Sequence, residues 1–126
     1  MSEKFTEAKP SPSTQSTATD RPARACVEVH YQITGDFTAY RALAEHAAPR
    51  LARTPGLLWK LWLLEEGGRQ AAGLYLFADD QAARAFLDGP ALEGLRQHPA
   101  ITGVTARRFG VLADLSLITG GQQAGL

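Results

Sequence analysis

Residues 57–77 read LLWKLWLLEEGGRQAAGLYLF and carry the clearest secondary-structure signal of the chain. Two runs rich in apolar residues flank the pair Gly67-Gly68, and this pattern is typical of a β-hairpin with a two-residue loop. In that register Lys60 lies opposite Tyr75, and Trp62 lies opposite Gly73. Because cross-strand neighbours share a face, the hairpin has two faces of different character.

One face of the hairpin is mixed and strongly aromatic, and the other is aliphatic apart from one tryptophan. The mixed face carries Leu58, Lys60, Trp62, Tyr75 and Phe77. The aliphatic face carries Trp59, Leu61, Leu63, Ala72, Leu74 and Leu76. We expect the aliphatic face to pack under helices and the mixed face to stay open. Exposure of so broad an apolar patch to water is unfavourable, so the open face needs a second subunit or a ligand to cover it.

The flanking sequence completes a β-α-β-β-α-β order. A strand is predicted over residues 26–33, with Val27 and Val29 on the helix side and Glu28 and His30 on the other. A helix is predicted over residues 37–53, with a kink or break at Pro49. A second helical region follows Asp79-Asp80, and a last strand spans about residues 102–112. This order predicts an α+β, ferredoxin-like fold.

The composition disfavours several classes of protein. The chain of 126 residues has 13 Lys and Arg against 13 Asp and Glu, which argues against a strongly basic nucleic-acid binder. Its single cysteine, Cys26, can form no intrachain disulfide and no Cys-rich metal site. No apolar run approaches the roughly 20 residues that cross a bilayer. We expect a cytoplasmic protein with no nucleic-acid or membrane partner.

The chain divides into one domain and two terminal segments. Residues 1–24 are rich in Ser, Thr and Pro and are expected to form a disordered tail. Residues 25–119 form the predicted domain. Residues 120–126 are rich in Gly and Gln and are expected to fray.

Two blocks of the sequence resemble the YdhR-type monooxygenase family. Residues 55–62 read PGLLWKLW and resemble the family's PGFLWKxW block, and residues 72–79 read AGLYLFAD and resemble its GGIYLFTD segment. Weaker similarity at Val29-His30-Tyr31, at residues 109–111 and at Leu115-Ser116 extends the resemblance over residues 26–119. One segment departs from the pattern, because residues 113–116 read ADLS and lack the proline of the family's EPLS-like segment.

The resemblance implies a dimeric α+β barrel built from two ferredoxin-like subunits. It also implies kinship with cofactor-independent monooxygenases that oxidise polycyclic phenols. We therefore expect a homodimer that acts on a small aromatic or phenolic substrate with dioxygen and without a cofactor. The dimer agrees with the need to cover the mixed face of the hairpin.

The candidate catalytic residues are His30 and Lys60. If the valines of the first strand pack under the helices, both side chains project into the same interior. A histidine can act as a general base near neutral pH, and a partly buried ammonium can bind a phenolate. The competing interpretations are a hydrogen-bonded structural histidine, and a lysine that forms an interfacial salt bridge or lays its stem on apolar surface.

The candidate substrate-binding residues are Trp62, Tyr75, Phe77, Leu58 and Glu28. The aromatic rings among them would offer flat surfaces to an aromatic substrate, and plain core packing is the competing interpretation. Glu28 is a partner for His30 or a residue at a wet rim. Arg107 and Arg108 alternate, so one of them faces inward, and parity does not choose between them.

Two other functions fit the same pattern. The first is a non-catalytic dimeric module that binds an apolar ligand or only itself. The second is an RNA-binding ferredoxin-like domain, in which Tyr75 and Phe77 would stack on bases. The sequence shows no metal-ligand spacing and no Gly-rich nucleotide motif, so neither a metal nor a cofactor is predicted.

Overall fold

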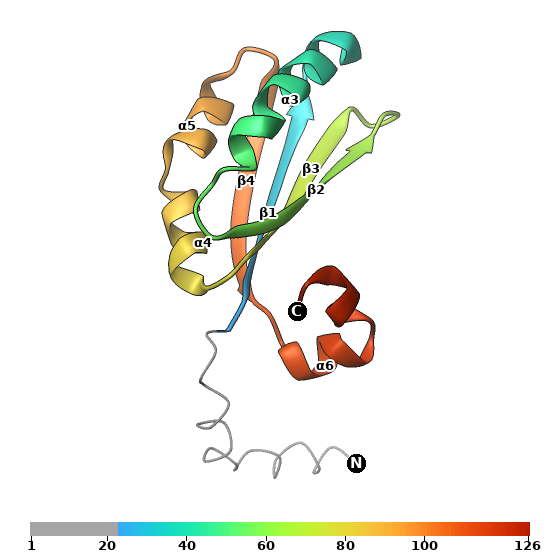
Figure 1. Ribbon diagram of the computed structural model, residues 1–126. Helices are drawn as coiled ribbons and strands as arrows, with labels where there is room; N and C mark the ends of the chain where they lie inside the picture. Colours follow the sequence, from blue (N-terminus) through green and yellow to red (C-terminus); the bar gives the residue numbers. More distant parts are fainter. Residues whose placement is uncertain (1–22) are drawn as a thin grey trace.

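The structure, a computed structural model, describes residues 23–126 (Figure 1). The predicted tail therefore lies outside the described residues except for its last two. The strands are β1 (Ala25–Ile33), β2 (Leu57–Glu65), β3 (Gln70–Phe77) and β4 (Ile101–Gly110). The main helices are α3 (Phe37–Leu51), α4 (Asp80–Leu87) and α5 (Pro90–Gln97). The strands form one antiparallel sheet in the order β2-β3-β1-β4, which confirms the predicted ferredoxin-like fold.

Local signals in the sequence place the helix starts. The Asp36 carboxylate accepts the Ala39 amide at 2.7 Å, and the Asp79 carboxylate accepts the Ala82 amide at 2.8 Å, so both residues act as N-caps. Of the kink or break predicted at Pro49, the break is wrong, because α3 continues through this residue to Leu51. A proline one turn from the end of a helix removes only one backbone hydrogen bond, and the helix absorbs that loss.

The hairpin has the register that the sequence predicts. Lys60 pairs with Tyr75, Trp62 pairs with Gly73, and the Arg69 amide donates to the Glu66 carbonyl at 3.0 Å across the turn. The register shifts between Leu57 and Trp59, so Leu57 and not Leu58 lies opposite Phe77. The extra residue in this bulge takes Leu58 out of the row that contains Lys60.

The faces of the hairpin are the reverse of the prediction. β1 lies between β3 and β4, and it pairs Val27 with Tyr75 and Val29 with Gly73. The aromatic row therefore shares the helix-covered face with the valines, and the row with Leu61 and Leu63 lies on the other face. Phe86 of α4 explains the preference, since its ring centroid lies 4.6 Å from that of Tyr75 and 5.4 Å from that of Phe77.

Helix α3 covers the sheet without packing tightly onto it. Val27, Val29, Ile33, Phe77 and Leu92 are fully buried between the sheet and the α4–α5 side, whereas no residue of α3 is buried. Figure 1 shows α3 as a separate layer over the sheet, with α4 and α5 beside it. Partly buried side chains of α3, among them Phe37, Tyr40 and Leu43, contact this core.

The end of the chain lies against the open face of the sheet. It forms α6 (Ala113–Ile118) and a short 3-10 helix, η1 (Gly121–Ala124), where the sequence analysis expected a frayed end from residue 120. The Trp59 indole donates a hydrogen bond to the Ala124 carbonyl. Within the described part of the chain, no helix has the length and apolar character needed to cross a membrane.

Candidate functional site

A cavity of about 470 Å³ lies between α3, the sheet and the α4–α5 segment. The sheet contributes Tyr31, Lys60, Trp62 and Tyr75. The helices contribute, among others, Tyr40, Leu43, Ala47 and Arg50 from α3, and Phe86, Leu92, Leu95 and His98 from the α4–α5 side. The lining is largely apolar and aromatic, with a few polar groups, as is usual for a small-molecule site.

Lys60 is the charged group that the sheet brings to this cavity. Its Nζ lies 3.1 Å from the centroid of the Trp62 ring and 4.8 Å from that of the Tyr75 ring. Among residues 23–126, no carboxylate forms an ion pair with it. Burial lowers the pKa of Lys60 from 10.5 to about 7, because the ammonium loses water. At neutral pH the side chain therefore exchanges readily between ammonium and free amine.

Gly73 makes the position of Lys60 possible. A β-carbon at residue 73 would lie 2.9 Å from Lys60 Cε and 2.9 Å from Tyr75 Cε1. The lysine stem and the tyrosine ring thus occupy space that any other residue at this position would fill. In the hairpin register predicted from the sequence, Lys60 lies opposite Tyr75 and Trp62 lies opposite Gly73, so the sequence alone already places the lysine diagonally across from the glycine.

The three tyrosines of the chain all line the cavity. The Tyr31 and Tyr40 hydroxyls lie 2.7 Å apart, and this hydrogen bond joins β1 to α3. One hydroxyl proton of the pair remains for a ligand, because only one is used between them. Burial raises the pKa of Tyr75 well above its ordinary value, and the ring is only 4% exposed, so its hydroxyl stays neutral.

His98 is a cavity residue that the sequence analysis missed. Its Nδ1 accepts the Ala100 amide at 3.1 Å, so the neutral imidazole carries its proton on Nε2. The signal that could have found it is its spacing, since Leu92, Leu95 and His98 follow one another at intervals of three residues.

His30 and Lys60 lie on opposite faces of the sheet, so the predicted acid/base pair is wrong. His30 pairs with Ala72 on the open face, and its Nε2 lies 3.5 Å from Glu28 Oε1. The side chains of His30 and Glu28 are both about half exposed and do not line the cavity. The physical reason is the reversed orientation of the hairpin faces. His30 lies on the open face, opposite the valines, as predicted, whereas the row that contains Lys60 lies on the helix-covered face and not on the open face.

The other predicted residues divide between the two faces. Trp62 and Tyr75 line the cavity, and Phe77 is buried core beside it. Leu58 is exposed outside the cavity.

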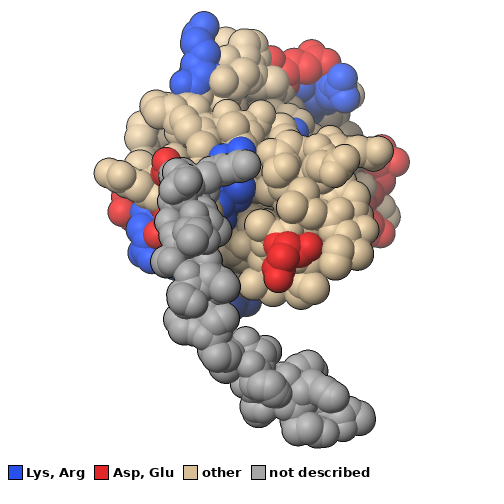
Figure 2. All heavy atoms as spheres, turned by 60° about the horizontal axis from the view of Figure 1, so that its bottom comes forward, with Lys and Arg blue, Asp and Glu red and all other residues tan. Residues whose placement is uncertain are grey.

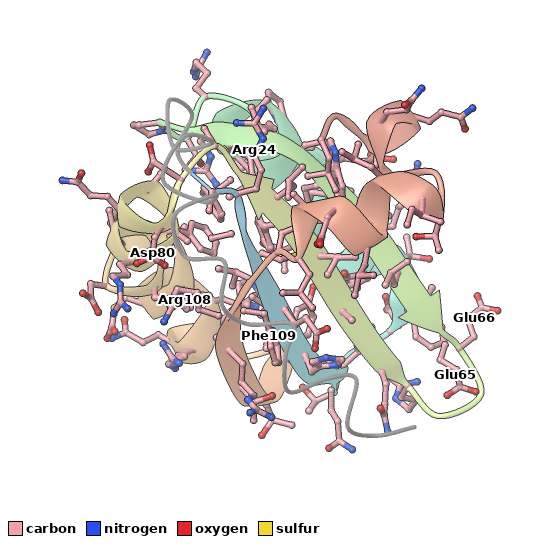
Figure 3. The ribbon with its side chains drawn as sticks, turned by 90° about the horizontal axis from the view of Figure 1, so that it is seen from below. Arg24, Glu65, Glu66, Asp80, Arg108 and Phe109 are labelled. Atoms are coloured by element: carbon pink, nitrogen blue, oxygen red, sulfur yellow. The ribbon has the colours of Figure 1, made fainter. Side chains whose placement is uncertain are left out.

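The two arginines of β4 also separate. Arg108 is the one on the helix side, where its Nη1 lies 2.6 Å from Asp80 Oδ1, and Figure 3 shows these two side chains next to each other. Arg107 shares the open face with Glu28.

A second, more open hollow adjoins the cavity and shares Thr54, Phe86, Pro90 and Ala91 with it. Its one acidic lining residue is Asp79, whose carboxylate is already bound as the N-cap of α4. Within residues 23–126, no group of three or more His, Cys, Asp or Glu side chains is placed to hold a metal ion.

Comparison with known proteins agrees with the fold. No curated protein matches the chain. SnoaB from Streptomyces nogalater, a cofactor-independent oxygenase, is similar with a TM-score of 0.58 at 18% identity, over 71% of this chain and 93% of that one. A protein of unknown function from Nitrosomonas europaea gives 0.60 at 17% identity, over 73% of this chain and 92% of that one.

A third structure and a family model complete the comparison. The heme-degrader MhuD from Mycobacterium tuberculosis gives a TM-score of 0.53 at 22% identity, over 69% of this chain and 95% of that one. At these identities the structures establish the fold alone. The family model described as "Putative mono-oxygenase ydhR" matches residues 26–122. The chain therefore belongs to the YdhR family, as the two sequence blocks around Trp59 and Tyr75 indicated.

Proposed function

We propose that this protein is a cofactor-independent monooxygenase that oxidises a phenolic aromatic compound with dioxygen in the cavity under α3. The observation that carries the proposal is Lys60, a partly buried amine with a pKa of about 7 between two aromatic rings on the cavity wall. Membership of the YdhR family and the similarity to the oxygenase SnoaB support the reaction class.

The first step is removal of the phenol proton. A substrate ring lying against Trp62 presents its hydroxyl to Lys60, and the free amine accepts the proton as a general base. The ammonium that forms then pairs with the phenolate. This ion pair is stronger than it would be in bulk water, because Lys60 is partly removed from solvent.

The second step is attack on dioxygen. The electron-rich phenolate transfers one electron to O₂, and the radical pair combines to form a C–O bond at a ring carbon. The Lys60 ammonium stabilises the anionic oxygen and returns the proton to the peroxide. Loss of the ring C–H proton and cleavage of the O–O bond give a quinone and water. Phenol and O₂ thus become quinone and water, and the substrate supplies all four electrons.

Haem is named with the similar MhuD structure, and the residues of this cavity do not fit it. His98 is the one histidine of residues 23–126 on the cavity wall. Because the Ala100 amide occupies Nδ1, the neutral ring presents an Nε2 proton where haem iron would need a lone pair.

We also propose that two copies associate through the open face of the sheet. From the sequence, Leu58, Trp62, Tyr75 and Phe77 were predicted to form this face. Leu61, Leu63 and Phe109 on this face, and Leu115 and Ile118 of α6, are all at least 40% exposed. The view in Figure 2 shows the lower end of the molecule, where uncharged residues occupy most of the visible surface.

Location in the cytoplasm and the absence of nucleic-acid and membrane partners stay predictions from the sequence.

Oxygen uptake with a panel of naphthols and larger polycyclic phenols tests the proposed reaction. Replacing Lys60 by methionine should lower turnover at least about a hundredfold, whereas His30→Ala, on the opposite face, should keep it within about twofold. Full turnover by Lys60→Met would show that the base is misassigned. Phenols that bind without any oxygen uptake would favour the non-catalytic binding module.

A further inference from the structure

In the part of the chain that the structure describes, the cavity wall carries lysine, arginine and histidine side chains but no carboxylates. Lys60, Arg50 and His98 line the cavity, and among the described residues none of its lining side chains is Asp or Glu. The whole chain has 13 acidic and 13 basic residues, so a general excess of basic residues does not explain this one-sided lining. A cavity lined by one sign of charge attracts ligands of the other.

Neither cation of the cavity has an acidic partner among residues 23–126. Two arginines on nearby elements are paired, since Arg41 of α3 lies 2.8 Å from Glu45 and Arg108 lies 2.6 Å from Asp80, whereas Arg53 and Arg96 form no ion pair with a described residue. Arg50, in the last turn of α3, forms no such pair. Its guanidinium is exposed at the cavity wall and is free to bind an anion from the solvent side.

The two cations come from opposite walls and differ chemically. Lys60 projects from the sheet between two aromatic rings and is partly buried, so it suits a group that loses its proton only after binding. Arg50 comes from the covering helix, and its planar guanidinium matches the two oxygens of a carboxylate. Aromatic and aliphatic side chains lie on the walls between them.

We propose that the substrate is an aromatic acid, a phenol that also carries a carboxylate, with Arg50 as the residue that binds the carboxylate. The phenol half of this inference rests on the proposed function, since it uses Lys60 as the group that faces the hydroxyl. The carboxylate half rests on the all-basic lining and on the free guanidinium. Neutral phenols of the same size bind more weakly, and aromatic amines that carry a positive charge are repelled.

Calorimetric titration without oxygen tests the inference with two matched compounds, 2-naphthol and 6-hydroxy-2-naphthoic acid. The acid should bind at least about tenfold more tightly, because it adds a charge-assisted contact. Arg50→Gln should remove this preference and leave the affinity for 2-naphthol unchanged. Arg53→Gln, an exposed arginine outside the cavity lining, is the matched control and should keep the preference. Arg50→Lys should keep part of it.

Three results would overturn the inference: equal affinity for the two compounds, an undiminished preference in Arg50→Gln, or no binding of the acid. The titration involves no turnover, so it separates this inference from the proposed reaction. If the acid preference depends on Arg50 while no oxygen is consumed, the carboxylate site stands and the oxygenase function fails. If phenols are oxidised without any preference for acids, the opposite holds.

Discussion

Replacing Gly73 by alanine tests whether an empty position on β3 keeps Lys60 in its buried place. The new methyl group would lie 2.9 Å from Lys60 Cε, 2.9 Å from Tyr75 Cε1 and 3.5 Å from Lys60 Nζ. The lysine stem can move away at little cost because it is flexible. The Tyr75 ring cannot, because it is 4% exposed and packs on Phe86.

The expected effect follows from two opposing contributions to the free energy of unfolding. Alanine in place of a strand glycine stabilises by about 0.5–1 kcal/mol through the unfolded chain, and overpacking costs about 1–3 kcal/mol. Taking the middle of each range, Gly73→Ala should therefore lower the free energy of unfolding by about 1 kcal/mol. Because the displaced ammonium regains water, the pKa of Lys60 should also rise from about 7 toward 10.5.

Urea denaturation followed by tryptophan fluorescence measures this change. Gly110→Ala is the matched control, because Gly110 also lies in a strand and a β-carbon there meets no atom within 4 Å. The control should unfold at the same or a slightly higher urea concentration than the wild type. Equal midpoints for Gly73→Ala and Gly110→Ala would refute the close packing of Lys60 and Tyr75 over position 73.

Two further predictions concern pH and assembly. Between pH 7 and 9, Lys60 loses its proton in the folded chain but keeps it in the unfolded chain. The free energy of unfolding of the wild type should therefore rise by about 2 kcal/mol relative to that of Lys60→Met in parallel urea titrations. A constant difference between the two proteins over this pH range would contradict the burial of this amine. Leu61→Glu, on the open face, should convert a dimer into a monomer in sedimentation equilibrium with unchanged circular dichroism. A wild-type monomer at micromolar concentration would contradict the proposed dimer.

Local chemistry made most of the fold predictable. The Gly67-Gly68 loop predicted the hairpin register, the first helix starts at residue 37 as predicted, and α4 starts within the Asp79-Asp80 pair. The face of the hairpin was not predictable in the same way. Parity relates residues within the hairpin, but the β1–β3 register that unites Val27 with Tyr75 is a long-range pairing that no local signal specifies.

The candidate site was predictable only on its sheet side. Lys60, Trp62 and Tyr75 were found because they share a row of one hairpin. Tyr40 and Arg50 were not, because α3 has an ordinary amphipathic pattern, and nothing in that pattern shows that the helix packs loosely enough to leave a cavity. His98 continues the spacing of Leu92 and Leu95 beyond the end of α5, where a helical stripe is not usually extended.

The protonation of Lys60 itself tests whether this side chain can act as the catalytic base. The chain has three lysines, Lys4, Lys9 and Lys60, so a sample with ¹³C-labelled lysine gives three ε-carbon signals in NMR spectra, and Lys60→Met identifies the third. Following that signal with pH should give a pKa of about 7 in the free protein. Saturation with 1-naphthol should raise this pKa, because a phenolate favours the ammonium. A Lys60 pKa near 10.5 that naphthol leaves unchanged would contradict a catalytic amine in this cavity.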